Sequence, residues 1–413
     1  MQQVNQKPET DKPMNASPPP CLALDGVRVL DLSRILAGPT ATQLLGDFGA
    51  DIIKIERPGV GDDTRTWGPP FVMDAAGSAT AESAYFLCAN RNKRSVEVDI
   101  STPEGAQIVR RLLAGCDILV ENFKVGGLKK FGLSYDDLRD EFPGLVYCSI
   151  TGFGQTGPNA GKPGYDLLAQ GYGGIMSLTG PADGEPTKVA VGISDVMTGM
   201  YAATAILAAL RHKERTGEGQ HIDIALVDCQ IAWLVNEGTN YLLTGKEPVR
   251  RGNQHPNIVP YQVFEAAKGH VIIAVGNDAQ FARFCDFLGA PILAADPAYA
   301  TNAARLVNRD TLIPTVSSLV KNWGRDDLIA GLEACGIPCG PINTLAQVFQ
   351  SDQVEARGMK VRVPYKGAAG GTVDLVGNPV KFSKTPITFY RAPPTCGTDT
   401  KAVLAEIHAN EHP

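Results

Sequence analysis

The N-terminal half of the chain alternates between short β-rich runs and longer helical runs, and this alternation limits the possible folds most. Residues 27–32 and 51–56 are rich in β-branched side chains, and they enclose a run from Pro39 to Gly49. Proline suits the first turn of a helix and glycine suits its end, so these residues predict a β-α-β unit. Similar strands are expected at 95–99, 117–120, 145–150 and 221–227. The expected fold is α/β, with a parallel sheet covered by helices.

The chain changes character from about Pro260. A hairpin is expected across residues 261–275, and helices follow it near 278–288, 309–323 and 325–335. A chain of 413 residues is too long for one simple core, so a second, smaller α+β domain fits both the pattern and the length. Residues 1–20 are polar and Pro-rich without an apolar core, which predicts a disordered tail with no targeting role.

The composition argues against several classes of protein. The net charge of −6 gives no basis for bulk binding of nucleic acid. No apolar run approaches the roughly 20 residues that span a bilayer, so no membrane contact is expected. The Cys residues number nine and mostly lie in apolar runs, as is typical of a reducing compartment, which predicts a cytoplasmic protein. The six His form no ligand cluster, and Cys335 and Cys339 lack a second pair, so no metal is expected.

One acid stands where a loop gives way to a helical run. Asp195 follows Gly192 closely and precedes the Ala-rich residues 201–210. A carboxylate at such a place can accept hydrogen bonds from free helix N–H groups and lies at the positive end of the helix dipole. Both effects would keep it ionised, as a carboxylate nucleophile must be. An ordinary helix cap would look the same, so both interpretations remain open from these residues alone.

Side chains suited to an anionic ligand follow the expected strands. Arg57 comes directly after the second strand, and Lys124 and Lys130 follow a later one. Asn122 and Phe123 stand beside Lys124 and could hydrogen-bond to a heterocycle and stack on it. Because the carboxyl ends of parallel strands share one edge of a sheet, these residues predict a binding site at that edge. Solvated surface cations and a buried phenylalanine would give the same pattern.

Two other loops carry candidate residues. Arg65 and Trp67 lie between Pro- and Gly-rich residues, where an arginine could bind a carboxylate with two hydrogen bonds beside an aromatic wall. A simply exposed arginine is the alternative. Tyr165 and Asp166 precede an apolar segment, where Asp166 could merely begin a helix. The chain has no nucleophile elbow, Walker loop or Gly-x-Gly-x-x-Gly fingerprint, so the residues themselves indicate an α/β enzyme with an anionic, nucleotide-bearing ligand.

Motifs spread over almost the whole chain, from Leu24 to about Ile407, resemble those of the class III CoA-transferases, the CaiB/BaiF family. The motifs are Leu-Ala-Gly-Pro at 36–39, Lys-Ile-Glu-Arg-Pro at 54–58, Asn-Lys-Arg-Ser at 92–95, Val-Glu-Asn-Phe at 120–123, Gly-Phe-Gly at 152–154, Gly-Tyr-Asp at 164–166 and Asp-Val-Met-Thr-Gly at 195–199. They follow one another in the order of the family.

The resemblance implies a covalent mechanism. Asp195 aligns with the family's nucleophilic aspartate, which forms a mixed anhydride with the acyl group and then a thioester with CoA. Coenzyme A and acyl-CoA are then substrates, and no prosthetic group is needed. The positions that bind CoA in the family are occupied here by Leu36, Ala37, Arg57, Val98, Asn122, Phe123, Lys124 and Lys130.

The resemblance also implies an assembly. Two copies form a homodimer of interlocked rings, in which long linkers join a large Rossmann-like domain to a small α+β domain. The chain is then expected to divide into a tail (1–20), the first part of the large domain (21–227), a linker (228–250), the small domain (251–345), a return linker (346–370) and the C-terminal part of the large domain (371–413).

Within the family the residues favour one branch. Residues 61–71 and 258–261 look like the succinyl-CoA:glutarate enzymes, which indicates succinyl-CoA as donor and a dicarboxylate such as glutarate as acceptor. Arg65, helped by His255, would then hold the distal carboxylate. The formyl-CoA:oxalate enzymes are an alternative, but their poly-glycine loop corresponds here to residues 251–257, which contain one Gly.

Two further alternatives differ in activity. The family's 2-methylacyl-CoA racemases pair the aspartate with a histidine that takes the α-proton, and this chain has Tyr165 at that position. A tyrosine, with a reference pKa of about 10, is a poor base at neutral pH, so racemase activity is not expected. A non-catalytic CoA-binding protein would keep the binding residues and show no turnover.

Overall fold

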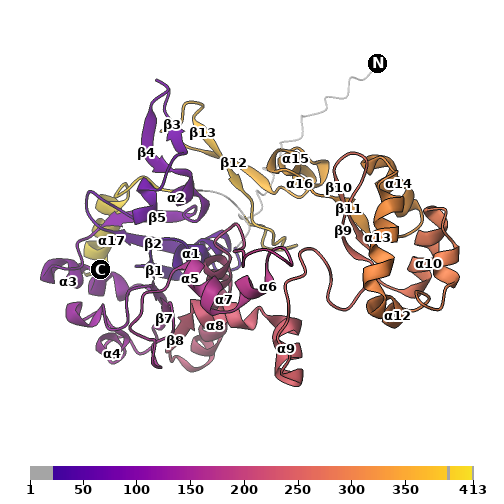
Figure 1. Ribbon diagram of the computed structural model, residues 1–413. Helices are drawn as coiled ribbons and strands as arrows, with labels where there is room; N and C mark the ends of the chain where they lie inside the picture. The colour runs from indigo at the N-terminus through magenta and orange to yellow at the C-terminus, as the bar shows by residue number, and fades with distance from the viewer. Residues whose placement is uncertain (1–21, 388–390, 412–413) are drawn as a thin grey trace, which may run out of the picture.

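A parallel sheet of six strands forms the centre of the larger part of the molecule. The computed structural model describes residues 22–387 and 391–411, so the tail expected at 1–20 lies outside the described residues. The strands are β1 (Arg28–Asp31), β2 (Asp51–Glu56), β5 (Lys93–Glu97), β6 (Ile118–Glu121), β7 (Val146–Thr151) and β8 (Gln220–Ala225). They lie in the order β5-β2-β1-β6-β7-β8, and each neighbouring pair is parallel (Figure 1). The expected α/β fold with a parallel sheet is confirmed.

Helices cover both faces of this sheet, because successive residues of each strand point to opposite sides. Val29 and Ile52 pack on the helices of one face, and Leu30 and Ile53 pack on those of the other. The first face carries α1 (Ala37–Asp47) and α7 (Ile193–Thr216), and the second carries α3 (Pro103–Leu113), α4 (Tyr135–Leu138) and α17 (Thr400–Glu411). The strand order reverses between β1 and β6, and sheets of this kind bind ligands beyond the carboxyl ends of the strands at that point.

Helix α7 has 24 residues and runs along α1. Its length and hydropathy are those of a membrane span, contrary to the expectation that no apolar run comes close to that length. Half of the apolar stretch is buried, and Ala202 and Ile206 belong to the core that α7 shares with α1 and the sheet. This burial is typical of a core helix. No other helix in residues 22–387 and 391–411 meets the same criteria.

Shorter elements connect the strands and helices of the sheet. They are η1 (Asp63–Thr66), β3 (Phe71–Met73), β4 (Ala79–Ser83), α2 (Ala84–Cys88), η2 (Lys129–Phe131), α5 (Asp166–Tyr172), α6 (Ile175–Leu178), α8 (Leu226–Ala232) and α9 (Val235–Thr244). Helices α5 and α8 both pack against α7, so they surround the helix that carries Asp195.

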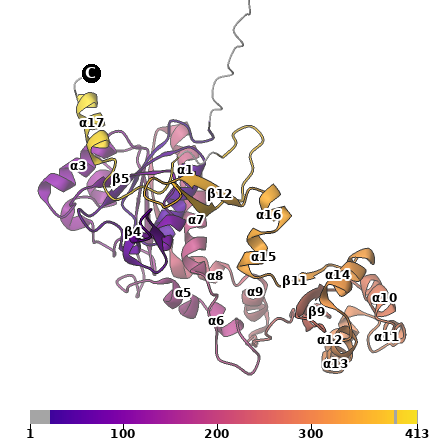
Figure 2. The same cartoon turned by 90° about the horizontal axis from the view of Figure 1, so that it is seen from above.

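A smaller three-stranded sheet with its own core follows α9. The strands are β9 (Tyr261–Glu265), β10 (His270–Ala274) and β11 (Cys339–Pro341), and the helices are α10 (Asp278–Phe287), α11 (Ile292–Ala295), α12 (Asn302–Val307), α13 (Arg309–Val320) and α14 (Arg325–Ala334). The sheet is antiparallel, and Phe264, Phe281 and Phe284 lie in its core. Figures 1 and 2 show this part set apart from the parallel sheet.

The chain then returns to the parallel sheet. It passes through α15 (Leu345–Phe349), α16 (Asp352–Ala356), β12 (Lys360–Pro364) and β13 (Thr372–Val376) before reaching α17. Beside β5, the backbone N–H of Ser95 donates to the Asp399 carboxylate at 2.9 Å, and the Asp399 N–H donates to the Ser95 carbonyl at 3.0 Å. Residues from the two ends of the chain therefore build one layered unit.

Candidate active site

Asp166 holds the start of the helix that carries Asp195. Asp195 is the third residue of α7, and the N-cap residue, Gly192, has no side chain to accept hydrogen bonds from the first turn. Instead Oδ1 of Asp166 accepts hydrogen bonds from the N–H groups of Ser194 at 2.8 Å and Asp195 at 3.4 Å. Its Oδ2 accepts a hydrogen bond from the Gln170 amide at 2.7 Å. The expected helix start is present, but the capping carboxylate is that of Asp166.

The ionisation of Asp195 differs from the expectation. Asp195 is 9% exposed. Burial, reinforced by the negative charge of Asp166, raises the pKa of Asp195 to about 7. The helix start was expected to keep Asp195 ionised. Because the nearby N–H groups serve Asp166 instead, burial dominates, and the ionised form of Asp195 predominates only above about pH 7.

Two glycines bring α1 and the loop before it against the first turns of α7. A Cβ on Gly199 would lie 2.7 Å from the carbonyl oxygen of Ala37, a separation that Cβ atoms do not adopt. A Cβ on Gly192 would lie 3.1 Å from the side chain of Leu36. Glycine is required at position 199, where the two backbones approach this closely, and at position 192 a side chain would press against Leu36. Leu36 and Ala37, both expected to contact CoA, therefore lie against the same turns of α7 as Asp195.

Tyr85 is a site residue that the sequence did not indicate. It belongs to α2, and burial, followed by the negative charge of Asp195, raises the pKa of Tyr85 to about 12. Its ring meets that of Trp67 edge to face, with 5.1 Å between the centroids. Trp67 is 43% exposed, so the two rings form an accessible aromatic wall within the field of Asp195. Tyr85 lies in a short helix without periodicity or motif, and only the tertiary structure reveals its place.

Arg65 is committed to a buried ion cluster, which corrects its expected role in holding a substrate carboxylate. Its guanidinium donates two hydrogen bonds to Glu56, at 2.8 and 2.7 Å, and one to Glu82 at 2.6 Å. A fourth donor reaches the carbonyl of Pro394 at 3.0 Å, and the guanidinium lies 3.6 Å from the ring centre of Phe86. Four of the five N–H donors are thus used inside the protein, so Arg65 braces the fold.

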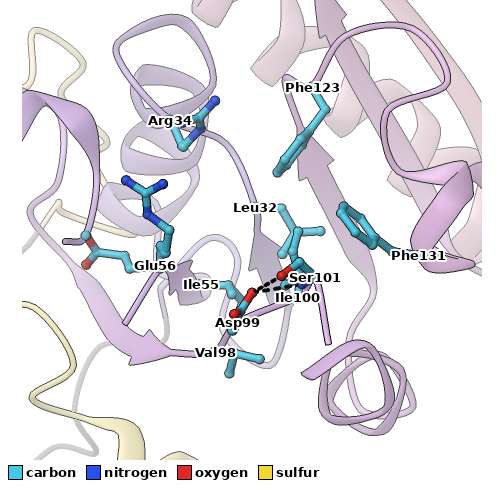
Figure 3. A pocket seen from close by; sticks show the side chains of 12 residues that line it. Leu32, Arg34, Ile55, Glu56, Val98, Asp99, Ile100, Ser101, Phe123 and Phe131 are labelled. Carbon is cyan, nitrogen blue, oxygen red and sulfur yellow. Dashed lines mark hydrogen bonds between the residues drawn. The ribbon is translucent and has the colours of Figure 1, made fainter. Parts of the chain in front are cut away.

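A groove of about 300 Å³ lies at the carboxyl ends of the central strands. In Figure 3, the rings of Phe123 and Phe131 lie on one side of this groove and Arg34 lies on the other. Arg57 and Val98, two of the expected CoA contacts, also line it. Aromatic rings with guanidinium groups beside them suit a heterocycle that carries phosphates.

The remaining expected CoA contacts lie around the groove. Asn122 fixes the backbone of Arg34, since its Oδ1 accepts the Arg34 N–H at 2.9 Å and its amide donates to the Arg34 carbonyl at 2.7 Å. The Lys130 ammonium lies 4.6 Å from the ring centre of Phe131. Lys124 lines a neighbouring hollow of about 180 Å³. These residues surround one edge of the sheet, as the strand order requires.

His255 and Tyr165 lie outside the groove. His255 belongs to the smaller part of the molecule and stacks on Tyr261, with 5.0 Å between the ring centroids. Figures 1 and 2 show the three-stranded sheet of that part set apart from α7. Tyr165 is the N-cap residue of α5 and is 60% exposed, so its ring is free to meet a ligand beside Asp166.

A groove at the carboxyl ends of the strands and a buried carboxylate at the start of α7 are compatible with an α/β enzyme. Comparison with known proteins gives the family. Residues 24–400 match CoA-transferase family III, and the chain belongs to this family. The protein is therefore a CoA-transferase.

Characterised relatives and a solved structure support the same assignment. The chain is 48% identical over 402 residues to the succinate–glutarate CoA-transferase of Agrobacterium fabrum, covering 97% of this chain and 98% of the relative. It is 44% identical to the succinyl-CoA:glutarate CoA-transferase of Mus musculus, covering 93% and 86%. A crystal structure of a CaiB/BaiF family protein from Brucella suis is 49% identical and superposes with a TM-score of 0.83, covering 94% of this chain and 99% of that one.

Proposed function

We propose that the protein transfers CoA from succinyl-CoA to a dicarboxylic acid such as glutarate, with Asp195 as a covalent relay. The names of the Agrobacterium fabrum and Mus musculus relatives support these substrates. One observation carries the role of Asp195. The loop after β1 has Arg34 in the groove, while Leu36 lies against Gly192, three residues before Asp195. A ligand held in the groove therefore has a direct route along this loop to the carboxylate.

The first half-reaction moves CoA from the donor to the enzyme. The Asp195 carboxylate attacks the carbonyl carbon of the acyl-CoA, and the carbon–sulfur bond breaks to give a mixed anhydride and CoA thiolate. The thiolate then attacks the aspartyl carbonyl carbon, which forms an Asp195–CoA thioester and releases the donor acid as its carboxylate. Covalent catalysis divides one difficult exchange into easier steps, and bound CoA keeps the reacting groups together.

The second half-reaction reverses these steps with the acceptor. The acceptor carboxylate attacks the Asp195 thioester to give a new mixed anhydride and CoA thiolate. The thiolate then attacks the acceptor's carbonyl carbon, which forms the product acyl-CoA and frees the Asp195 carboxylate. No net proton is consumed, so the reaction requires no base beyond the ionised Asp195. Its raised pKa makes it a stronger nucleophile than an ordinary carboxylate once it has ionised.

We propose a homodimer as the working form, in which a second copy completes the site. Exposed apolar side chains on α9 support it, since Leu242 and Leu243 are 82% and 79% exposed. Tyr172 on α5 and Ile231 on α8 are also exposed beside the helix that carries Asp195. Large exposed apolar side chains of this kind are typical of a surface that a partner covers. In an interlocked dimer the small domain of one copy could bring its His255 to the Asp195 of the other.

We also propose that the large domain is Rossmann-like and that the protein is cytoplasmic. Counted along the chain, the six parallel strands lie in the order 3-2-1-4-5-6, which supports a Rossmann-like large domain. The eight described cysteines are all unpaired, which supports a reducing compartment such as the cytoplasm.

Mass spectrometry of acyl-CoAs tests this function. The protein is incubated with succinyl-CoA and glutarate, and glutaryl-CoA is the expected product. Hydroxylamine added with succinyl-CoA should leave a hydroxamate on Asp195. Asp195→Asn should abolish both signals, whereas Asp228→Asn, which changes an exposed acid in the first turn of α8, should retain them. The proposal would be contradicted if Asp195→Asn still transferred CoA. It would also be contradicted if the wild-type protein showed no transfer with any acyl-CoA donor.

A further inference from the structure

The turn that separates the groove from Asp195 contains a residue in a disfavoured backbone conformation. Ile35 has φ of 73°, in the left-handed region. L-residues other than glycine, asparagine and aspartate rarely adopt this conformation, and a β-branched residue there is an outlier. Such outliers persist only where the surroundings hold them, and they concentrate at functional sites. Ile35 stands between Arg34, which lines the groove, and Leu36, which lies against α7.

A buried ion pair holds this turn. Both carboxylate oxygens of Asp62 accept a hydrogen bond from the Ile35 N–H, each at 3.3 Å. The Lys54 ammonium donates to Asp62 at 2.9 Å and to the carbonyl of Ser33 at 2.8 Å. Asp62 and Lys54 have side chains that are fully buried. One ion pair thus grips the chain on both sides of Arg34.

The residues around Ile35 are also fixed, so the strain is confined to it. On the β1 side, Asp31 accepts the Ser33 N–H at 2.9 Å. On the α1 side, the Lys93 ammonium donates to the carbonyl of Pro39 at 3.0 Å. The Arg34 backbone is held from both sides by Asn122. With its neighbours tied down, the chain reaches α7 at the observed place only if Ile35 keeps its positive φ.

We propose that Lys54 and Asp62 are positioning residues, which hold Ile35 in its left-handed conformation and so set Leu36 and Ala37 against the turn of α7 that carries Asp195. This inference rests on the proposed function for its kinetic effect. The electrostatics agree with it, because Lys54 and the neighbouring N–H and O–H groups of Thr64 hold the pKa of Asp62 at about 2, against the effect of burial. The ion pair of Lys54 and Asp62, which we call the clamp, therefore stays ionised around neutral pH.

A rescue experiment separates positioning from simple stabilisation. Asp62→Asn removes the charge that faces Lys54, so Ile35 can relax to a negative φ and carry Leu36 away from α7. We expect kcat to fall by between about tenfold and about a hundredfold, as for a displacement of about 1 Å at a reacting centre. Glycine adopts positive φ without strain. Ile35→Gly should therefore restore part of kcat in the Asp62→Asn background, whereas Ile35→Ala, which keeps a Cβ, should not.

Two comparisons complete the experiment. Asp74→Asn is a matched control, because Asp74 also accepts backbone N–H groups of a turn, those of Ala76 and Ser78, at a distant exposed hairpin. It should leave kcat unchanged. If Asp62→Asn does not fold, Ile35→Gly and Ile35→Ala are compared in the wild-type background. Strain at Ile35 predicts a higher melting temperature for Ile35→Gly than for Ile35→Ala.

Equal recovery by glycine and alanine, no loss of kcat in a folded Asp62→Asn protein, or a lower melting temperature for Ile35→Gly would overturn the inference. Failure of the proposed function gives a different result, namely a wild-type protein without transfer from any acyl-CoA. In that case hydrogen exchange of the residue-35 amide, which donates to Asp62, reads the clamp directly. Protection of this amide from exchange should be lower in Asp62→Asn than in the wild type. It should rise again in the double variant that also carries Ile35→Gly. Unchanged protection would contradict the clamp.

Discussion

Oδ1 of Asp166 lies 2.8 Å from the backbone nitrogen of Ser194 and 3.4 Å from that of Asp195, so one carboxylate caps the helix on which the other stands. The negative charge of Asp166 adds to the effect of burial and raises the pKa of Asp195. Asp166 accepts the N–H groups of the helix start. Asp195 is buried, and because its pKa is raised to about 7, it becomes ionised only near neutral pH.

Asp166→Asn should shift the pH dependence of transfer. The asparagine keeps an oxygen for the Ser194 N–H but loses the negative charge that raises the pKa of Asp195. The rate of the first half-reaction in the wild type should rise with pH through about 7, where Asp195 ionises. In Asp166→Asn the same rise should occur at lower pH. Rates of CoA release from acyl-CoA measured between pH 5 and pH 9 test this, and an unshifted acid limb would show that Asp166 does not act on Asp195.

Asp195→Asn should stabilise the protein at alkaline pH and not in acid. The pKa of Asp195 rises from 3.8 to about 7 on folding, so the unfolded state loses its proton first as pH increases. Ionisation therefore lowers the free energy of unfolding progressively between about pH 4 and pH 7, by up to about 4 kcal/mol above that range. The neutral asparagine removes this cost. Melting temperatures at pH 4.5 and pH 8 should diverge from the wild type only at pH 8, and equal gains at both would refute the link.

Arg65→Met should destabilise the fold without changing the choice of acceptor. The change leaves Glu56 and Glu82 buried without their cation, which typically costs about 3–5 kcal/mol. Urea unfolding measures the loss, and Arg362→Met serves as a control because Arg362 pairs with Asp374 on the surface. That pair should be worth less than about 1 kcal/mol. A stable Arg65→Met protein that discriminates against dicarboxylates would restore the substrate role first expected for Arg65.

Gly199→Ala should force α1 and α7 apart. The new methyl group would lie 2.7 Å from the Ala37 carbonyl oxygen and 2.8 Å from the Cβ of Thr40. Overpacking of this kind costs about 1–3 kcal/mol, and here it also moves Ala37 relative to Asp195, so kcat should fall. Gly115→Ala is the matched control, because its methyl group would meet the end of Arg28 at 3.4 Å and the Leu112 carbonyl oxygen at 3.8 Å, both ordinary contacts. If both variants keep the wild-type rate, the spacing of α1 and α7 does not matter for the reaction.

The sequence predicted the parallel sheet because each strand carries its own signal. The β-branched run at residues 51–56 became β2 with the same bounds, and the helix near Pro39 became α1, which begins two residues earlier. The start of α7 near Asp195 was predicted as well, since a Gly-containing loop before an Ala-rich run marks a helix start. These features depend on residues that are neighbours in the chain.

The sequence by itself therefore determined the strands, the helix starts and, through its motifs, the family. Only the tertiary structure decided how the charged groups behave, because their partners are distant in the chain. Arg65 donates hydrogen bonds to Glu82 and to the carbonyl of Pro394, which is 329 residues away in the chain. Asp195 owes its raised pKa to burial and to Asp166, and Tyr85 enters the site from a helix of five residues. Ionisation and positioning follow from packing between segments, and no local pattern encodes that packing.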